Sequence, residues 1–119
     1  MLSIEEHVEK ASRNEAFARW LLSQDVDHYD WVLVAGFYSA VHFVESALLA
    51  KKAPSHDHAT RDGSIARLLR DCYKPYRRLK DLSIEARYNR VTIPKGNFNL
   101  DVVNDLEAIK RGTRFARRA

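Results

Sequence analysis

Cysteine, glycine and proline are all scarce in this chain of 119 residues. The single cysteine, Cys72, excludes an internal disulfide and a cysteine-based metal cluster, and it fits a reducing compartment. Its neighbours Leu68, Leu69 and Tyr73 predict a buried, inert thiol. Four glycines and three prolines leave few breaks for the chain, and no glycine-rich phosphate loop occurs.

The sequence also lacks a targeting segment and a convincing membrane span. Its start, MLSIEEHVEK, is acidic and mixed, whereas a signal peptide has a basic start followed by an apolar run. The most apolar stretch, residues 31–50, is about as long as a membrane span, but it contains His42 and Glu45 and has charged flanks. We therefore expect a buried core helix in a cytoplasmic protein that does not associate with membranes.

Charge is divided unevenly along the chain. Residues 1–59 carry 5 Lys/Arg and 9 Asp/Glu, whereas residues 60–119 carry 15 and 7, so the second half has a net charge of +8. Arginine supplies 13 of the 20 basic residues, and its guanidinium suits phosphate recognition. This asymmetry permits a polyanionic partner, although solvated helices would produce it equally well.

Apolar residues recur at helical spacing almost throughout, which predicts an all-α domain over residues 1–119. Short loops between helices favour an up-and-down bundle of four to five antiparallel helices. We expect Ser3 and Glu6 to form a capping box, Pro75 to lie in the first turn of the fourth helix, and Asn99 to cap the fifth. The expected helices cover residues 3–23, 27–52, 58–73, 75–90 and 99–117.

The segment 27–52 is apolar nearly all round, so it is predicted to be the central helix. Gly36, Ala40 and Ala47 form a stripe of small residues along it. Another helix can approach closely there, and that helix could come from this chain or from a second copy.

Two histidines stand beside possible partners. His42 and Glu45 are three residues apart, so the carboxylate could orient the imidazole as in general-base histidines, or the pair could simply be satisfied at the core edge. His58 and Arg61 have the same spacing and could contact a phosphate or assist phosphodiester cleavage, unless they form only a polar cap. The H-x-H spacing of His56 and His58 supplies too few ligands for a metal site, and no metal or cofactor is expected.

Arginines of two kinds occur in the segment YRRLKDLSIEARYN, residues 76–89. Arg77 and Arg78 are interpreted as solvated charges, with Asp81 a weak partner of Arg77. Arg87 lies beside the apolar stripe, so it is expected to be half buried and to need a defined partner. Ser83 precedes it by one turn and Tyr88 follows it. The chain ends in a basic cluster that a helix dipole or a polyanion would favour, namely Lys110, Arg111, Arg114, Arg117 and Arg118.

The stretches DWVLVAGFYSAVHFVESALLAKK, HATRD and YRRLKDLSIEARYN together resemble the bacterial HEPN-domain superfamily, in particular a small stand-alone group of it. The resemblance covers about residues 27–115. It implies a four- or five-helix bundle, dimerisation through the central helices and binding of RNA or nucleotides. The resemblance also suggests metal-independent RNase activity, because many members of the superfamily are such RNases in toxin–antitoxin, abortive-infection and CRISPR systems.

The chain departs from the pattern of those RNases. They use an arginine followed, after four to six residues, by a histidine, and no arginine here has a histidine at that spacing. Arg87 lies near the position of the family's arginine, with His58 and Arg61 on the preceding helix. A histidine from another helix, His58 or His42, could replace the missing one.

Three hypotheses follow. The first is a module that binds RNA or a nucleotide, in a toxin–antitoxin or defence context. The second is an RNase with an altered site. The third is an antitoxin-like or dimerisation partner held by residues 27–52, with a cognate toxin, antitoxin or nucleotidyltransferase. The candidate binding residues are Arg61, Ser83, Arg87 and Tyr88, and the candidate catalytic residues are His42, His58, Arg61 and Arg87.

Overall fold

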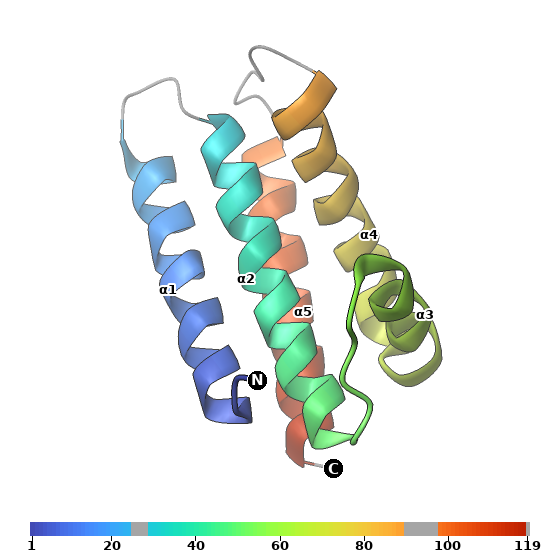
Figure 1. Cartoon of the computed structure of the whole chain (residues 1–119). Helices are drawn as coiled ribbons and strands as arrows, with labels where there is room; N and C mark the ends of the chain where they lie inside the picture. Colours follow the sequence, from blue (N-terminus) through green and yellow to red (C-terminus); the bar gives the residue numbers. More distant parts are fainter. Residues whose placement is uncertain (25–28, 90–97, 119) are drawn as a thin grey trace.

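The chain is an all-α bundle, as its apolar periodicity predicts (Figure 1). The computed structural model describes residues 1–24, 29–89 and 98–118, and no strand occurs within these ranges. Four long helices run alternately up and down, and the short α3 lies against α4. The elements are α1 (Ile4–Ser23), α2 (Tyr29–Ala50), α3 (His58–Leu68), α4 (Arg70–Ile84), the π-helical turn η1 (Glu85–Asn89) and α5 (Phe98–Arg118).

Helix α2 is the centre of the bundle, packing against α1, α3, α4 and α5. It is long and apolar enough to cross a membrane, yet 78% of its most apolar window is buried inside the bundle. It is therefore a core helix, as predicted. A Cβ on Gly36 would lie 3.2 Å from Val102 of α5, so at this point the small-residue stripe admits a helix of the same chain.

Helix α1 begins where the sequence predicts. The backbone N–H of Ser3 donates to Glu6 Oε1 at 3.0 Å, and the N–H of Glu6 donates to Ser3 Oγ at 3.1 Å, which completes the predicted capping box. Farther along, the hydroxyl of Ser39 on α2 donates to the carbonyl of Ala11 at 2.7 Å. Because both groups are buried, this bond fixes α1 against α2.

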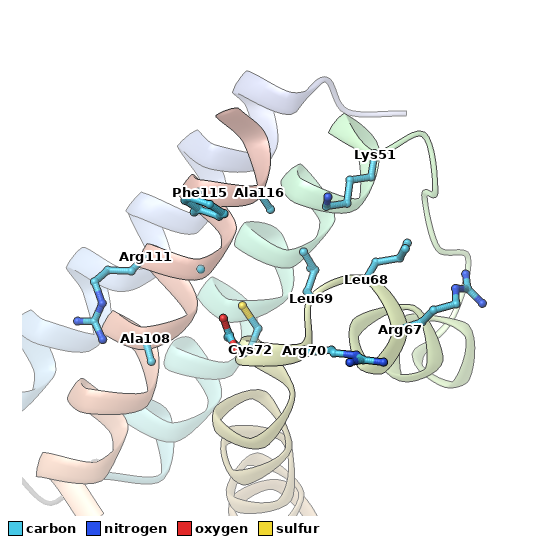
Figure 2. A pocket seen from close by; sticks show the side chains of 12 residues that line it. Lys51, Arg67, Leu68, Leu69, Arg70, Cys72, Ala108, Arg111, Phe115 and Ala116 are labelled. Carbon is cyan, nitrogen blue, oxygen red and sulfur yellow. The ribbon is translucent and has the colours of Figure 1, made fainter. Parts of the chain in front are cut away.

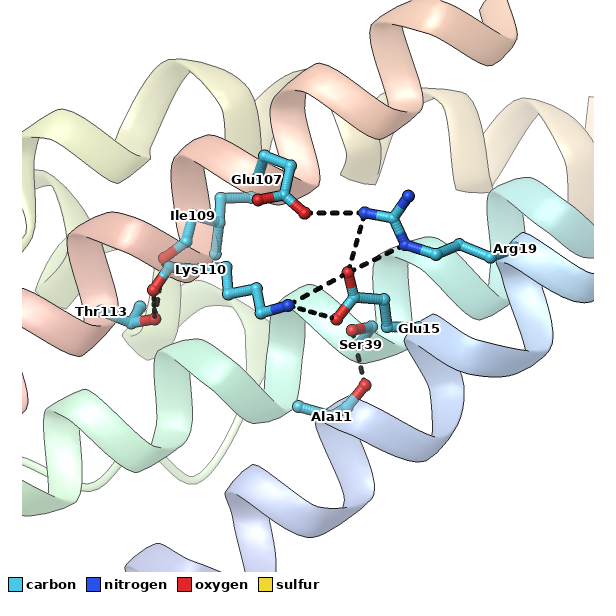
Figure 3. Close-up of polar contacts among 8 residues, drawn as sticks. All are labelled: Ala11, Glu15, Arg19, Ser39, Glu107, Ile109, Lys110 and Thr113. Carbon is cyan, nitrogen blue, oxygen red and sulfur yellow. Dashed lines mark hydrogen bonds and ion pairs between the residues drawn. The ribbon is translucent and has the colours of Figure 1, made fainter.

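A buried carboxylate joins α1 to α5 (Figure 3). Glu15 is only 6% exposed. Its side chain accepts from Arg19 at 3.0 Å and lies 3.1 Å from the amine of Lys110, while Arg19 also reaches Glu107 at 2.7 Å. A buried carboxylate needs such compensation because leaving it unpaired costs several kcal/mol, roughly 3–5.

The predicted boundary between the third and fourth helices is wrong. The break falls at Leu69, whose φ of −132° and ψ of 55° are not helical, and Pro75 lies inside α4. Proline there removes the backbone bond to the carbonyl of Asp71, and its ring crowds that carbonyl. Burial of Cys72 and Leu79 on one face of α4 outweighs that loss.

Other helix ends differ by a few residues. Helix α2 ends at Ala50 because Lys52 adopts a φ of 60°, and the N–H of Ala53 bonds back to the carbonyl of Leu48 at 2.8 Å, as in a Schellman cap. Helix α5 begins at Phe98, so Asn99 lies within it and is not its cap. The predicted start of the second helix at residue 27 and the end of the fourth at residue 90 lie outside the described residues.

The thiol of Cys72 is buried, as expected, and burial raises its pKa to about 11.

We expect Gly112→Ala to lower the free energy of unfolding by about 1–2 kcal/mol, because the added Cβ would lie 2.6 Å from the Cys72 Sγ. The matched control is Gly63→Ala, where a Cβ meets nothing within 4 Å and helix propensity should add about 0.5–1 kcal/mol. Urea denaturation measures both, and Cys72→Ala should abolish the cost at residue 112. Equal stability of the two glycine variants would contradict this account.

Candidate functional site

Two candidate residues from separate elements meet over one buried ring of α2. The ring centroid of His58 lies 6.2 Å from that of Phe37, and the guanidinium of Arg87 lies 6.0 Å from the same centroid. Phe37 itself is fully buried. The structure thus brings His58 of α3 and Arg87 of η1 to one corner of the bundle, which we call the Phe37 corner.

Helix α3 starts at His58 because Asp57 caps it. The Asp57 carboxylate accepts from the backbone N–H of Thr60 at 2.7 Å. That hydrogen bond also lowers the pKa of Asp57. The cap therefore determines where His58 and Arg61, one turn apart, emerge from the loop.

Arg61 forms a buried ion pair with Glu45 of α2. Its Nε lies 2.7 Å from Glu45 Oε1, and the two side chains are 12% and 9% exposed. The hydroxyl of Ser55 also donates to this carboxylate. Burial lowers the pKa of Arg61, but the hydrogen bond to Glu45 and the nearby Tyr76 outweigh it, so the pKa is raised overall. The charge of Arg61 is already balanced, which leaves it little capacity to bind a phosphate.

Arg61 also determines the tautomer of His58. Its Nη1 lies 2.9 Å from His58 Nδ1, and because a guanidinium can only donate, Nδ1 must accept. The imidazole is then neutral with its proton on Nε2. Partial burial lowers the pKa of His58, and the neighbouring Arg61, Lys80 and Arg87 lower it further. His58 can donate from Nε2, but it has no free lone pair with which to act as a base.

Arg87 is held by aromatic rings and backbone. Its guanidinium lies 5.9 Å from the ring centroid of Tyr38 and 5.1 Å from that of Tyr88, in addition to Phe37. Its Nε donates to the carbonyl of Ser83 at 3.3 Å, and Nη1 lies 3.4 Å from the Tyr38 hydroxyl. No carboxylate among the described residues pairs with it. Arg87 is half buried, as predicted, and the partners that hold it are aromatic rings.

The remaining two candidate binding residues differ in accessibility. Ser83 is fully buried, and its hydroxyl has no hydrogen-bond partner in the described part of the chain. It therefore supports Arg87 through its carbonyl and cannot meet a ligand at the surface. Tyr88 is 72% exposed and Tyr38 is 39% exposed, so both rings border the corner.

His42 does not form the predicted pair with Glu45, which is engaged by Arg61. Its Nδ1 lies 3.0 Å from the Nδ1 of His7 on α1, so one of the two rings donates a hydrogen bond to the other. Both line a cavity of about 380 Å³ that also contains Glu45 and Arg61. Sequence reasoning missed His7 because its partner is 35 residues away. Within the described ranges, no group of three or more metal-ligating side chains occurs.

Arg77 and Arg78 remain largely solvated, as the sequence suggested, with 41% and 57% of their side chains exposed, but each also pairs with a carboxylate of another helix. Arg78 binds the buried carboxylate of Asp105 on α5, with its Nη2 at 2.6 Å from Oδ1 and its Nε at 3.0 Å from Oδ2. Arg77 reaches Asp62 of α3 at 3.1 Å and the predicted Asp81 at 3.8 Å. These arginines connect α4 to its neighbours, which removes them from the candidate site.

Part of the C-terminal basic cluster is also structural. Lys110 pairs with Glu15, and Arg117 Nη1 donates to Ser46 Oγ at 2.9 Å. Burial, followed by the charges of Arg114 and Arg118, lowers the pKa of Arg117.

No protein-family model matches the chain, and no curated protein matches it. The chemistry of the Phe37 corner therefore rests on its own geometry. Arg87 offers a positive charge that no carboxylate of the described residues neutralises, His58 offers a neutral N–H donor, and Tyr38 and Tyr88 offer two partly open rings. Such a corner can bind a phosphate attached to an aromatic base.

The part-buried pair of His7 and His42 predicts a dependence of stability on pH. Burial lowers the pKa of both rings, so below about pH 6.5 the unfolded chain binds more protons than the folded one. The stability present at neutral pH is lost as the pH falls towards the depressed folded pKa. We therefore expect the free energy of unfolding, measured by urea denaturation, to be lower at pH 5 than at pH 7.

The control for this prediction removes one titrating ring. His42→Gln keeps a hydrogen-bonding side chain opposite His7 and should flatten the pH dependence. His56→Gln, which changes an exposed ring in the same cavity, should keep the wild-type slope. Equal slopes for the two variants would show that the His7–His42 pair is not responsible.

Proposed function

We propose that this chain is a HEPN-like helical protein that binds RNA or a nucleotide at the Phe37 corner without cleaving it. The observation that carries the proposal is the state of Arg87. It is preorganised over three aromatic rings and has no carboxylate partner among the described residues. An arginine in this state can take a phosphate without first breaking an ion pair.

Each residue of the corner has a separate role in this proposal. Arg87 binds the phosphate, and the Nε2–H of His58 donates a second hydrogen bond to it. Tyr88, 72% exposed, offers a face on which a base stacks. Arg61, neutralised by Glu45, positions His58 and does not contact the ligand itself.

The alternative is a metal-independent RNase in which His58 or His42 is the acid or base and Arg61 and Arg87 stabilise the phosphate. The geometry favours binding over this alternative. The lone pair of His58 is engaged by Arg61, and His42 is engaged by His7. General-base catalysis would require one of these contacts to break first.

We expect Arg87→Gln to weaken binding of a labelled single-stranded RNA about tenfold at low salt, and to reduce the slope of log affinity against log salt by about 0.7. Fluorescence anisotropy between about 50 and 200 mM salt measures both quantities. The matched control is Arg13→Gln, which removes an equal charge from an arginine that is 79% exposed on α1 and should change binding little.

The same samples distinguish the alternatives. The RNA should remain intact after prolonged incubation, with or without a chelator. Cleavage that disappears in His58→Ala would favour the RNase. Absence of RNA and nucleotide binding by the wild type at low salt would refute the proposal and favour the antitoxin-like partner.

We further propose that two copies associate through the outer stripe of α2, in the cytoplasm. Trp31 is 56% exposed and Tyr38 is 39% exposed on this helix, although its other faces are covered. A second copy would cover these rings beside Arg87. A cognate toxin, antitoxin or nucleotidyltransferase in a defence system is the partner class that the resemblance suggests.

Dimerisation predicts different effects for two tryptophans of equal exposure. Trp31→Lys on α2 should shift the protein from dimer to monomer in light scattering after size exclusion. Trp20→Lys on α1, where the tryptophan is 57% exposed, should leave the dimer intact. A monomeric wild type at micromolar concentration, or equal effects of both changes, would contradict this proposal.

A further inference from the structure

A second surface, separate from the Phe37 corner, lies between the α3–α4 junction and the C-terminal half of α5 (Figure 2). It is an open groove of about 650 Å³. Leu69, Cys72 and Ala116 form its apolar floor. The glycine at 112 lets α5 pass close to the Cys72 thiol.

The rim of this groove is strongly basic. Lys51, Arg67, Arg70 and Arg111 all line it, and all four are exposed. In Figure 2, Arg67 and Arg111 extend on opposite sides of the floor. None of the four forms an ion pair with a carboxylate in the described part of the chain, and Asp71 is the acidic residue found among the lining.

The rim arginines differ from those arginines that join one helix to another through a carboxylate. Arg19, Arg61 and Arg78 each bind a buried carboxylate, so these three arginines act as structural partners. The rim arginines have no such role. Because these cations surround one groove, they repel one another, and an anionic ligand would reduce that repulsion.

An aromatic ring stands beside the same groove. Phe115 lines the groove and is 78% exposed, whereas Phe37 is fully buried. An uncovered phenyl ring among unpaired cations is the combination found where single strands bind, since every base has a face that stacks. An acidic peptide would pair with the cations, but its carboxylates would not stack on the Phe115 ring.

We propose that this groove binds single-stranded RNA, as a second contact for a strand held at the Phe37 corner. The inference extends the proposed function and rests on it for the identity of the ligand. Helix α3 connects the two surfaces: His58 at its start and Arg67 near its end are about 13 Å apart along its axis. A strand that follows α3 can engage both surfaces, so its affinity exceeds that of either contact alone.

The test uses the full chain and a single-stranded RNA about 12 nucleotides long. The groove variant combines Arg67→Gln, Arg70→Gln and Arg111→Gln. We expect it to bind this RNA at least tenfold more weakly at low salt, with the slope of log affinity against log salt reduced by about 2. Phe115→Ala should weaken binding about tenfold without altering that slope.

A control variant removes the same charge from outside the groove. It combines Arg13→Gln, Lys74→Gln and Arg114→Gln, which are all exposed and do not line the groove. Its affinity should stay within about threefold of the wild type. Equal losses in both triple variants would mean that only net charge matters and would overturn the inference. Circular dichroism and urea denaturation check that each variant is folded.

Ligand length separates this inference from the proposed function. Adenosine monophosphate is too short to reach both surfaces, so Arg87→Gln should weaken its binding while the groove variant should not. If the groove variant loses RNA affinity and Arg87→Gln does not, the groove is the RNA site and the Phe37 corner is not. Unchanged RNA affinity in the groove variant, or wild-type binding of an acidic peptide in preference to RNA, would refute the groove proposal.

Discussion

The burial of α2 on nearly all sides is the constraint on which the rest of the structure depends. Phe37, Val44 and Leu48 are fully buried, and each such side chain contributes about 1.5–3 kcal/mol. The other helices must cover this one, so their order around it is decided by its apolar surface. What remains open on α2 is a single stripe with Trp31 and Tyr38, and the candidate site can form only beside it.

Within this arrangement, the Glu45–Arg61 ion pair connects packing to chemistry. Glu45 is a buried acid on the central helix, and losing its partner would cost roughly 3–5 kcal/mol. Arg61 is therefore held in place, and through it α3 and the His58 ring. The pair also lies between two histidine environments, with His58 on one side and the His7–His42 pair in the adjoining cavity. Arg61, which the sequence predicts to contact a phosphate, is thus first a structural residue.

The π-helical turn after α4 has a comparable effect on Arg87. A π-helical turn has more residues per turn than an α-helix, so its side chains point in different directions from those of a continued α-helix. Such turns are common at functional sites, and this one contains Arg87 and Tyr88. Here it brings Arg87 back over Phe37 and leaves Tyr88 exposed. The two cationic surfaces of the molecule consequently differ in kind: the Phe37 corner is built from one arginine and several rings, and the groove from several cations and one ring.

Local pattern was sufficient for the helices of this protein and for contacts within one turn, including the capping box of Ser3 and the contact of His58 with Arg61. It failed at Pro75, because the local preference of proline for a first turn was weaker than the burial of the α4 face around it. It could not find the partners of His42, Arg78 or Arg61, which lie 16 to 35 residues away. Spacing along a helix determines neighbours three or four residues apart, whereas the pairing of distant charges is decided only when the helices pack, because burial makes an unpaired charge too costly to keep.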